Sequence, residues 1–305
     1  MKQKVMNVLL GGALLLSAPL FTSCQDILGE WDRPTPASGG SGGSASEGVE
    51  YVAYTVSGST ATPSNKTATT YTEVTSSTTT WAAGTYVVSS DVTINGNVTL
   101  SGDVQLILCD GKTLTVNGQI ASTQESYAPV NSLTVYGQTG GTGELKVTTT
   151  ASEHSIDCKN IYFHGGKLTG SNSEGTVGQV IFVTDELSVI AGTVKATSTS
   201  GVPVMIDQGA LSVYDATLEA TTAATNNVIS NWGTGTFTIY SNTAVVKALC
   251  DGGSAALGCA ITNGAAAALS YDTSTDGGAT WTAAADIAVS GTASPTAAYV
   301  RFPHE

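Results

Sequence analysis

Three aspartates and one asparagine recur at similar places in successive segments of this chain. Each follows a short apolar run, at Asp157, Asp185, Asp207 and Asn231. If those runs stack, the carboxylates lie close together and repel one another unless they are exposed, share protons or bind a cation. Calcium takes several oxygen ligands, so the three aspartates are candidate calcium ligands, and a close carboxylate pair also suits glycoside hydrolysis. The alternative is that turns select Asp and Asn for their own backbone hydrogen bonds.

A second set of side chains, the aromatic column, carries flat rings at equivalent places: Tyr136, His164, Tyr214 and Tyr240, with Ile190 in the one segment that lacks a ring. Rings stacked about 5 Å apart would form a platform for sugar rings. Alternatively, the rings stack only on one another at a corner, which contributes about 0.5 to 1.5 kcal/mol per pair.

A third set, the lysine column, contains Lys146, Lys195 and Lys247, with Thr169 and Glu219 at the equivalent places in between. On an acidic protein these lysines could bind the carboxylates of an acidic glycan. A solvated strand face with no specific partner is the alternative, because isolated surface charges contribute little.

An internal repeat must position these side chains. Five segments alternate apolar and polar residues and begin at intervals of 28, 26, 24 and 26 residues, at Leu133, Ile161, Leu187, Leu211 and Phe237. This alternation is typical of a strand with one buried face. Within one repeat, residues 180–185, 187–190 and 193–197 form three strand-like runs separated by turns. A repeat of this length with no helical pattern predicts a β-solenoid whose coils stack on one another.

Three strands per repeat resemble the right-handed parallel β-helix of the pectate-lyase-like class, which we expect over residues 85–262. The fold class is therefore all-β, with an N-terminal cap at 49–84 and a C-terminal β cap or hairpin at 263–305. A two-sheet sandwich is the competing fold, since it also contains many short strands.

The N-terminal residues have the features of an export signal. Lys2 and Lys4 precede an apolar stretch at 8–16 that is too short to span a bilayer, and small residues then lead to Cys24. Residues 20–24 resemble the lipobox of bacterial lipoproteins, which implies a signal peptide at 1–23, lipidation of Cys24 and a flexible linker at 24–48. The resemblance implies an exported protein held at the outer membrane or cell surface by its lipid alone. An ordinary cleaved signal with Cys24 as a bystander is the alternative.

Composition limits the partners. The formal net charge is −13, and loss of Lys2 and Lys4 with the signal peptide would make it −15, which argues against nucleic acid. Of the other cysteines, we expect Cys109 and Cys158 to be buried as small hydrophobic residues, whereas Cys250 and Cys259 are the one local pair that export would allow to oxidise. Their spacings do not resemble a zinc site.

A short motif near the C-terminus, residues 274–281, has Ser, Asp, Gly, Thr and Trp at the spacing of the Asp-box of sialidase propellers. That resemblance implies a structural hairpin closed by Asp276, with Trp281 packed against it. Sialidase activity is not implied, because the chain has one copy of the motif and lacks an arginine triad.

In architecture and repeat style the chain resembles non-catalytic carbohydrate-binding β-helices, so we expect glycan binding or adhesion. Polysaccharide lyase or glycoside hydrolase activity is the first alternative, although the chain has no arginine between residues 34 and 300 to act as a lyase base. A structural scaffold in a surface assembly is the second. No cofactor is expected other than calcium at the aspartates.

Overall fold

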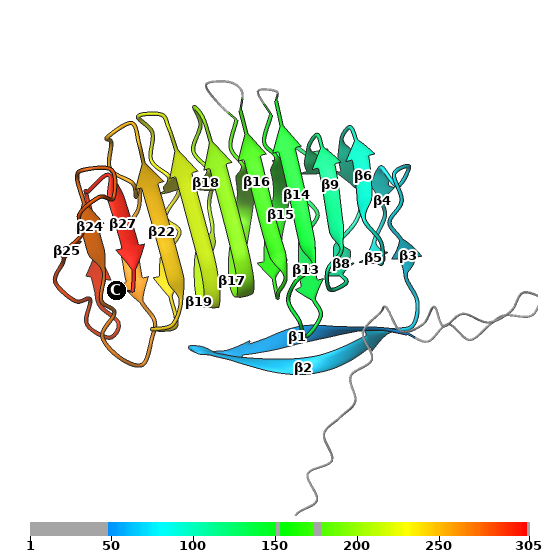
Figure 1. Cartoon of the computed structure of the whole chain (residues 1–305), viewed down its shortest axis with the longest axis horizontal. Coiled ribbons are helices and arrows are strands. Elements are labelled where there is room, and N and C mark those ends of the chain that lie inside the picture. The colour runs from blue at the N-terminus through cyan, green and yellow to red at the C-terminus, as the bar shows by residue number, and fades with distance from the viewer. Residues whose placement is uncertain (1–47, 151–152, 174–177, 304–305) are drawn as a thin grey trace, which may run out of the picture. The chain divides into compact units, whose positions relative to one another are not determined.

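The computed structural model describes residues 48–150, 153–173 and 178–303, and within these ranges the secondary structure is all β. The strands wind into a β-solenoid of about seven turns, which confirms the expected parallel β-helix (Figure 1). The signal peptide, Cys24 and nearly all of the linker lie outside the described residues. Within the described ranges, no helix is long and apolar enough to cross a membrane.

Three parallel ladders run the length of the coil. The first joins β4 (Thr80–Trp81), β7 (Val98–Leu100), β10 (Ile120–Ser122), β15 (Ile156–Phe163), β17 (Ile181–Ser198), β18 (Val204–Ile206) and β20 (Ile229–Asn231). The second joins β3 (Thr72–Glu73), β5 (Gly84–Val88), β8 (Val104–Leu108), β13 (Leu133–Gly137), later parts of β15 and β17, β19 (Ala210–Thr222), β21 (Phe237–Ile239) and β23 (Ile261–Asn263). The third joins β6 (Val92–Asn95), β9 (Thr113–Asn117), β14 (Glu144–Thr149), β16 (Lys167–Asn172), the ends of β17 and β19, and β22 (Val245–Cys250).

The register of the second ladder agrees with the internal repeat. Its Cα partners, taken along the chain, are Leu133, Ile161, Leu187, Leu211 and Phe237. These pairs are parallel, so the antiparallel sandwich is excluded as the fold of this region. The coil provides each crossover between parallel strands, and no helices are needed.

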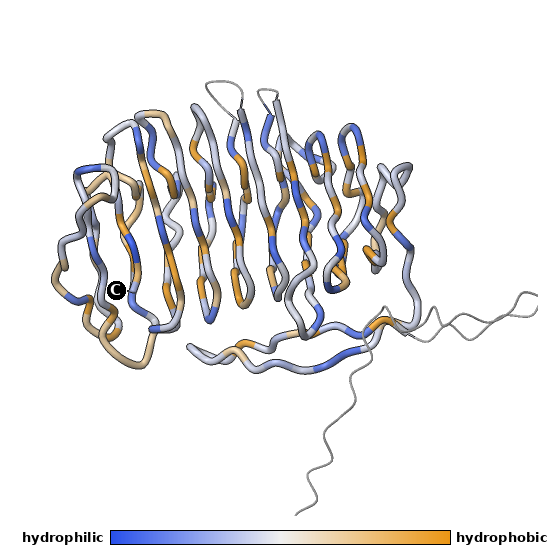
Figure 2. Tube along the Cα trace, viewed as in Figure 1, coloured by the Kyte–Doolittle hydropathy of each residue, from blue (hydrophilic) through white to orange (hydrophobic). Residues whose placement is uncertain are grey.

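The core lies along the axis of the coil. Its side chains come from the inward positions of all three ladders, and hydrophobic and hydrophilic residues accordingly alternate along each turn (Figure 2). Cys109 and Cys158 are fully buried, as expected. Cys250 and Cys259 are thiols and do not form the disulfide that their spacing would permit.

Residues 49–84, expected as an N-terminal cap, divide between two structures. The strands β1 (Val49–Ser57) and β2 (Thr60–Ala68) form an antiparallel hairpin beside the coil, and β1 pairs with β13 at Val52 and Gly137 (Figure 1). The segment that follows contributes β3 and β4 to the first turn of the coil.

Antiparallel strands close the C-terminal end of the described coil. They are β24 (Asp272–Ser274), β25 (Thr282–Ala283), β26 (Thr292–Ala293) and β27 (Tyr299–Phe302). Strand β27 pairs with β22 and β24, and β26 pairs with β23, so the last parallel strands have antiparallel partners. Such pairing occupies backbone groups that an open edge would expose.

The Asp-box motif forms the hairpin between β24 and β25, as expected. One carboxylate oxygen of Asp276 accepts hydrogen bonds from the Ser274 hydroxyl at 2.7 Å and the Thr280 amide at 2.9 Å. The Thr280 hydroxyl donates to the other carboxylate oxygen, and this bond first, then the Thr280 amide and the Ser274 hydroxyl, lower the pKa of Asp276 to about 2. The guanidinium of Arg301 lies 4.4 Å from the Trp281 ring centroid, so the tryptophan packs on the closing strand.

Candidate binding site on the first sheet

The three aspartates do not form a column, so that expectation is wrong. Asp157 pairs with Phe182 in the next coil, and the amide of Asp207 donates to Val183, two residues before Asp185. A register shift between Cys158 and Asn160 offsets the turns that follow the first strands. Among the described residues, no group of three or more His, Cys, Asp or Glu side chains is placed to hold a metal ion. The stacked-carboxylate basis for calcium binding is thereby lost.

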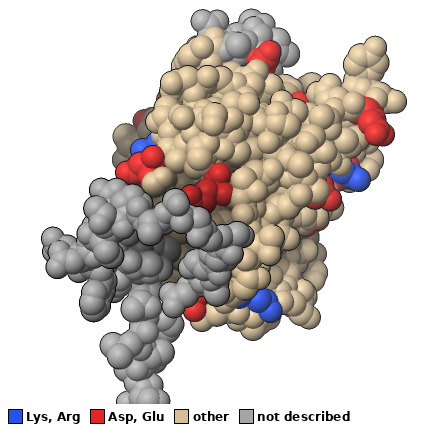
Figure 3. Space-filling model, turned by 90° about the vertical axis from the view of Figure 1, so that its right-hand side faces the viewer, with Lys and Arg blue, Asp and Glu red and all other residues tan. Residues whose placement is uncertain are grey.

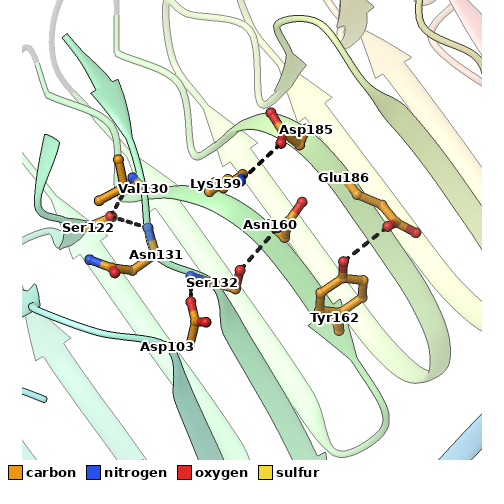
Figure 4. A network of polar contacts seen from close by, with 10 residues as sticks. All are labelled: Asp103, Ser122, Val130, Asn131, Ser132, Lys159, Asn160, Tyr162, Asp185 and Glu186. Atoms are coloured by element: carbon orange, nitrogen blue, oxygen red, sulfur yellow. Dashed lines mark hydrogen bonds and ion pairs between the residues drawn. The ribbon is translucent and has the colours of Figure 1, made fainter. Parts of the chain in front are cut away.

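Asp185 belongs instead to a polar network at the turn between the strands of the first ladder and those of the second (Figure 4). Its carboxylate lies 3.6 Å from the Lys159 ammonium, and both side chains are about half exposed. In the same region the Tyr162 hydroxyl donates to Glu186 at 3.1 Å. Burial first, and the Glu186 charge second, raise the pKa of Tyr162 to about 12. This network has the properties of a surface turn rather than of a catalytic carboxylate pair.

The aromatic column forms, but its rings contact one another and the N-terminal hairpin. Tyr214 and Tyr240 stack with centroids 4.6 Å apart and an interplanar angle of 6°. Tyr136 and His164 lie 4.9 Å apart, and Tyr51 of β1 packs 4.7 Å from Tyr136.

Backbone contacts also cover this part of the column. The amide of Tyr54 donates to Nδ1 of His164 at 3.0 Å, and burial lowers the pKa of His164 to about 4. These contacts favour the structural alternative, in which the rings stack on one another, and β1 additionally covers Tyr136 and His164. Glycan binding at these rings stays a prediction.

The lysine column has the expected register, with its members partnered across the third ladder. Lys146 lies 3.3 Å from Glu144, and Lys195 lies 2.6 Å from Glu219. Lys247 is the Cα partner of Glu219 on one side and of Arg301 on the other. Because carboxylates offset two of the three lysines, the column is a weaker candidate for an acidic glycan than the sequence suggested.

A concavity lies on the sheet that the first ladder forms, and we call it the groove. Its volume is about 440 Å³, and it is lined by Gln179, Gly201, Val202, Met205, Thr225, Asn226, Asn227, Ser230, Trp232 and Ser254. Trp232 is 67% exposed and offers a free ring at the side of the groove. Amides, hydroxyls and one exposed indole therefore surround an open cavity.

The repeat sets the floor of the groove. Met205 and Ser230 are direct Cα partners in the first ladder, and the same outward column continues through Phe182 to Asp157. Phe182 stacks on His154 with centroids 4.6 Å apart. Neighbouring coils of a parallel ladder lie about 4.8 Å apart, so these four side chains form one straight stripe.

Two acceptors on this face are buried without a hydrogen-bond partner: Oδ1 of Asp157 and Oε1 of Gln179. Their residues are 4% and 5% exposed. Oδ2 of Asp157 accepts one bond from Gln124 at 3.2 Å. An unpaired buried acceptor lowers stability, so residues of this kind are expected where a ligand supplies the missing donor.

A small inserted hairpin covers Asp157. It consists of β11 (Gln124–Glu125) and β12 (Ala128–Pro129), and it forms a two-stranded sheet separate from the coil. Ser126 and Tyr127 at its tip have φ values of 52° and 70°, a left-handed conformation that costs energy for residues other than glycine. Tyr127 is 97% exposed. The groove face thus carries an exposed aromatic residue on each of two turns.

Searches of protein-family models, curated proteins and solved structures found no match to this chain. The function must therefore be argued from its own residues.

Sequence reasoning missed the groove. Trp232 directly follows Asn231, the last of the four residues with which the three aspartates were aligned in sequence. Alignment of the first strands would have shown a tryptophan where Asp207 stands one coil earlier. Gln179 carried no comparable signal, because only the structure reveals that its oxygen is buried without a donor.

Replacement of Asp157 by asparagine is expected to stabilise the protein at neutral pH. Burial raises the pKa of Asp157 from 3.8 to about 6, so the native state binds this proton more tightly than the unfolded state does. The stability cost of the carboxylate therefore grows as pH rises from about 4 to about 6 and is fully present above that range. We expect a gain of about 1 to 2 kcal/mol at pH 7.5 and almost none at pH 4.

Urea unfolding of both proteins at the two pH values measures this difference. Asp185→Asn is the matched control, because that carboxylate is half exposed and lies beside Lys159. Equal stability of Asp157→Asn and the parent at pH 7.5 would show that the Asp157 carboxylate is not destabilised by its surroundings.

Proposed function

We propose that this protein is an exported, lipid-anchored β-helix of the pectate-lyase-like kind that binds a glycan without turnover, in the groove on the first sheet. The observation that carries the proposal is Trp232, an exposed indole beside a groove lined by amides and hydroxyls. Sugar rings bind well to a flat aromatic face, while their hydroxyls need polar partners around the edge. Cys24 would carry the lipid that holds the protein at the outer membrane or cell surface.

The polar side chains around Trp232 are held in place by the backbone. The side-chain nitrogen of Asn227 donates to the Ala255 carbonyl at 2.7 Å, and that of Asn226 donates to the Ser200 carbonyl at 2.9 Å. These bonds fix the orientation of both amides before any ligand binds. Pre-oriented polar groups reduce the entropy that a ligand must overcome on binding, so they support a binding site.

Binding without turnover is favoured over hydrolysis by the positions of the carboxylates. A retaining glycosidase needs two carboxyl groups about 5 to 5.5 Å apart, and an inverting one needs them about 6.5 to 9.5 Å apart. The candidate pairs for hydrolysis are Asp157 with Asp185 and Asp185 with Asp207, and the register has the members of each pair in different columns. Asp157 accepts its described hydrogen bond from an amide.

Trp232→Ala is expected to weaken retention on a polysaccharide array by at least about tenfold. A tryptophan ring that a ligand covers contributes on the order of 1 to 2 kcal/mol or more to the binding free energy. Tyr240→Ala is the matched control, since it removes a ring from the aromatic column and leaves the groove intact. Loss of retention in Tyr240→Ala alone would move the site to the aromatic column. Absence of retention on every glycan, with a stable protein partner instead, would favour the scaffold alternative.

A further inference from the structure

The groove and Asp157 lie on one continuous stripe. Met205 and Ser230 line the groove, and Phe182 and Asp157 occupy the same outward column in the two preceding coils. With coils about 4.8 Å apart, Asp157 lies about 15 Å from the coil of Ser230 along the axis. A short oligosaccharide lying parallel to the axis would therefore reach from Trp232 to Asp157.

The two buried groups without a partner, one lining the groove and one on the stripe, are both acceptors. Oε1 of Gln179 and Oδ1 of Asp157 belong to neighbouring coils, and each is buried without a donor. A ligand that satisfies them must bring N–H or O–H groups. A carboxylate group brings no donor to these acceptors and would add repulsion at Asp157.

The charge of the groove and of the whole chain further restricts the class of ligand. None of the described residues that line the groove is charged, and the whole chain is strongly acidic. Figure 3, which faces the N-terminal end of the described coil, likewise shows mostly uncharged side chains, with a few acidic and basic groups scattered among them. Asp157 is a buried carboxylate whose described partner is neutral, so a cation at Oδ1 would remove the cost of burying it.

An organic ammonium fits Asp157 better than a metal ion does. Calcium takes six to eight oxygen ligands, whereas the described residues hold no acidic cluster that could supply them. An ammonium group donates three hydrogen bonds and forms a short charge-assisted bond with a single carboxylate oxygen.

We propose that the groove binds a glycan containing an amino sugar, with the ammonium group on Oδ1 of Asp157 and a sugar further along the same glycan on Trp232. This inference rests on the proposed glycan-binding function and specifies the ligand class. The hairpin β11–β12 covers the ammonium site. Because that hairpin is a separate two-stranded sheet, it can move from Asp157 without breaking a ladder of the coil.

Affinity for the amino sugar should depend on pH through Asp157. Its neighbours are Gln124 on the hairpin, the Cys158 thiol and the Phe182 ring, with His154 stacked behind that ring and Glu125 exposed on the hairpin. Burial raises the pKa of Cys158 and lowers that of His154 to about 4, so neither group titrates between pH 5 and 7. The pKa of Asp157 is raised to about 6, within that interval.

Calorimetric titration of the purified full-length protein tests the proposal with four hexamers: glucosamine, N-acetylglucosamine, glucose and galacturonate. At pH 7 we expect the glucosamine hexamer to bind at least about tenfold more tightly than its acetylated form. That preference should fall at pH 5, where Asp157 is protonated and the amine stays charged. Asp157→Asn should lose the preference but still bind the neutral hexamers, and Trp232→Ala should weaken binding of all of them.

The outcomes distinguish failure of the amino-sugar assignment from failure of the proposed glycan-binding function. An unchanged preference for the glucosamine hexamer in Asp157→Asn, or galacturonate binding as tight as that of glucosamine, overturns the amino-sugar assignment and leaves glycan binding in place. Failure of all four hexamers and of the polysaccharide array to bind overturns both. Asp157→Asn removes a buried charge and is expected to fold, so loss of preference would not reflect loss of structure.

Discussion

Gly209→Ala is expected to destabilise the protein by about 3 to 4 kcal/mol, among the largest effects of any small substitution in the coil. A Cβ atom at this position would overlap the carbonyl oxygen of Asp185 in the preceding coil. The next coil repeats the arrangement, because a Cβ at Gly235 would overlap the carbonyl oxygen of Gly209. That same carbonyl accepts a hydrogen bond from the Asn231 side chain at 2.9 Å, so the backbone cannot move away without losing it.

Chemical denaturation measured by circular dichroism would test this expectation. Thr234→Ala is the control, because Thr234 lies in the same turn as Gly235, is exposed and already has a Cβ atom. We expect the control to change stability by less than about 0.5 kcal/mol. A Gly209→Ala protein as stable as the control would mean that the turns of neighbouring coils are less closely spaced than the structure indicates. Since Gly209 lies in the turn that follows the first strand, loss of this packing should also weaken glycan binding in the groove.

Arg301→Ala is expected to cost about 3 to 5 kcal/mol, because it leaves a buried carboxylate without its cation. Nε and a terminal nitrogen of Arg301 each lie 2.8 Å from Oδ2 of Asp272, which is fully buried. The substitution also removes the guanidinium from the Trp281 ring. The pair joins β27 to β24, and β27 in turn covers β22, so its loss should open the C-terminal end of the coil.

The double variant Asp272→Ala with Arg301→Ala separates the charge effect from packing. We expect it to recover part of the lost stability, because no unpaired buried charge remains. Thermal unfolding of the parent, both single variants and the double variant completes the cycle. A double variant that equals the sum of the two single losses would show that the ion pair contributes nothing beyond the packing of its side chains.

Regular alternation made much of the fold predictable. The second strands, beginning at Leu133, Ile161 and Leu187, keep the same apolar spacing, and the structure pairs them in that register. A shift of one residue would turn every apolar side chain outward, so burial enforces this register strongly. The register of the lysine column was predictable for the same reason. Glu219, the Cα partner of Lys195, already occupied an equivalent place in the sequence repeat.

The first strands were less predictable because their turns differ in length. The register shift between Cys158 and Asn160 separates Asp157 from Asp185, and no local pattern in the sequence marks it. The aromatic column was aligned correctly, but its cover comes from Tyr54, which is 110 residues from His164. Contacts over such distances depend on how an added hairpin docks, and a repeat carries no information about that.

The amino-acid sequence by itself determined a parallel coil with three strands in each turn, because apolar residues at a fixed period bury themselves only when the coils stack in one register. The tertiary structure decided which face of that coil is open. It placed a hairpin over one set of aromatic rings, left Trp232 exposed beside a polar groove, and buried Asp157 and Gln179 with acceptors that no described donor satisfies. Exposure and unmet hydrogen bonds arise from neighbours far along the chain, so they become visible only when the whole coil is assembled.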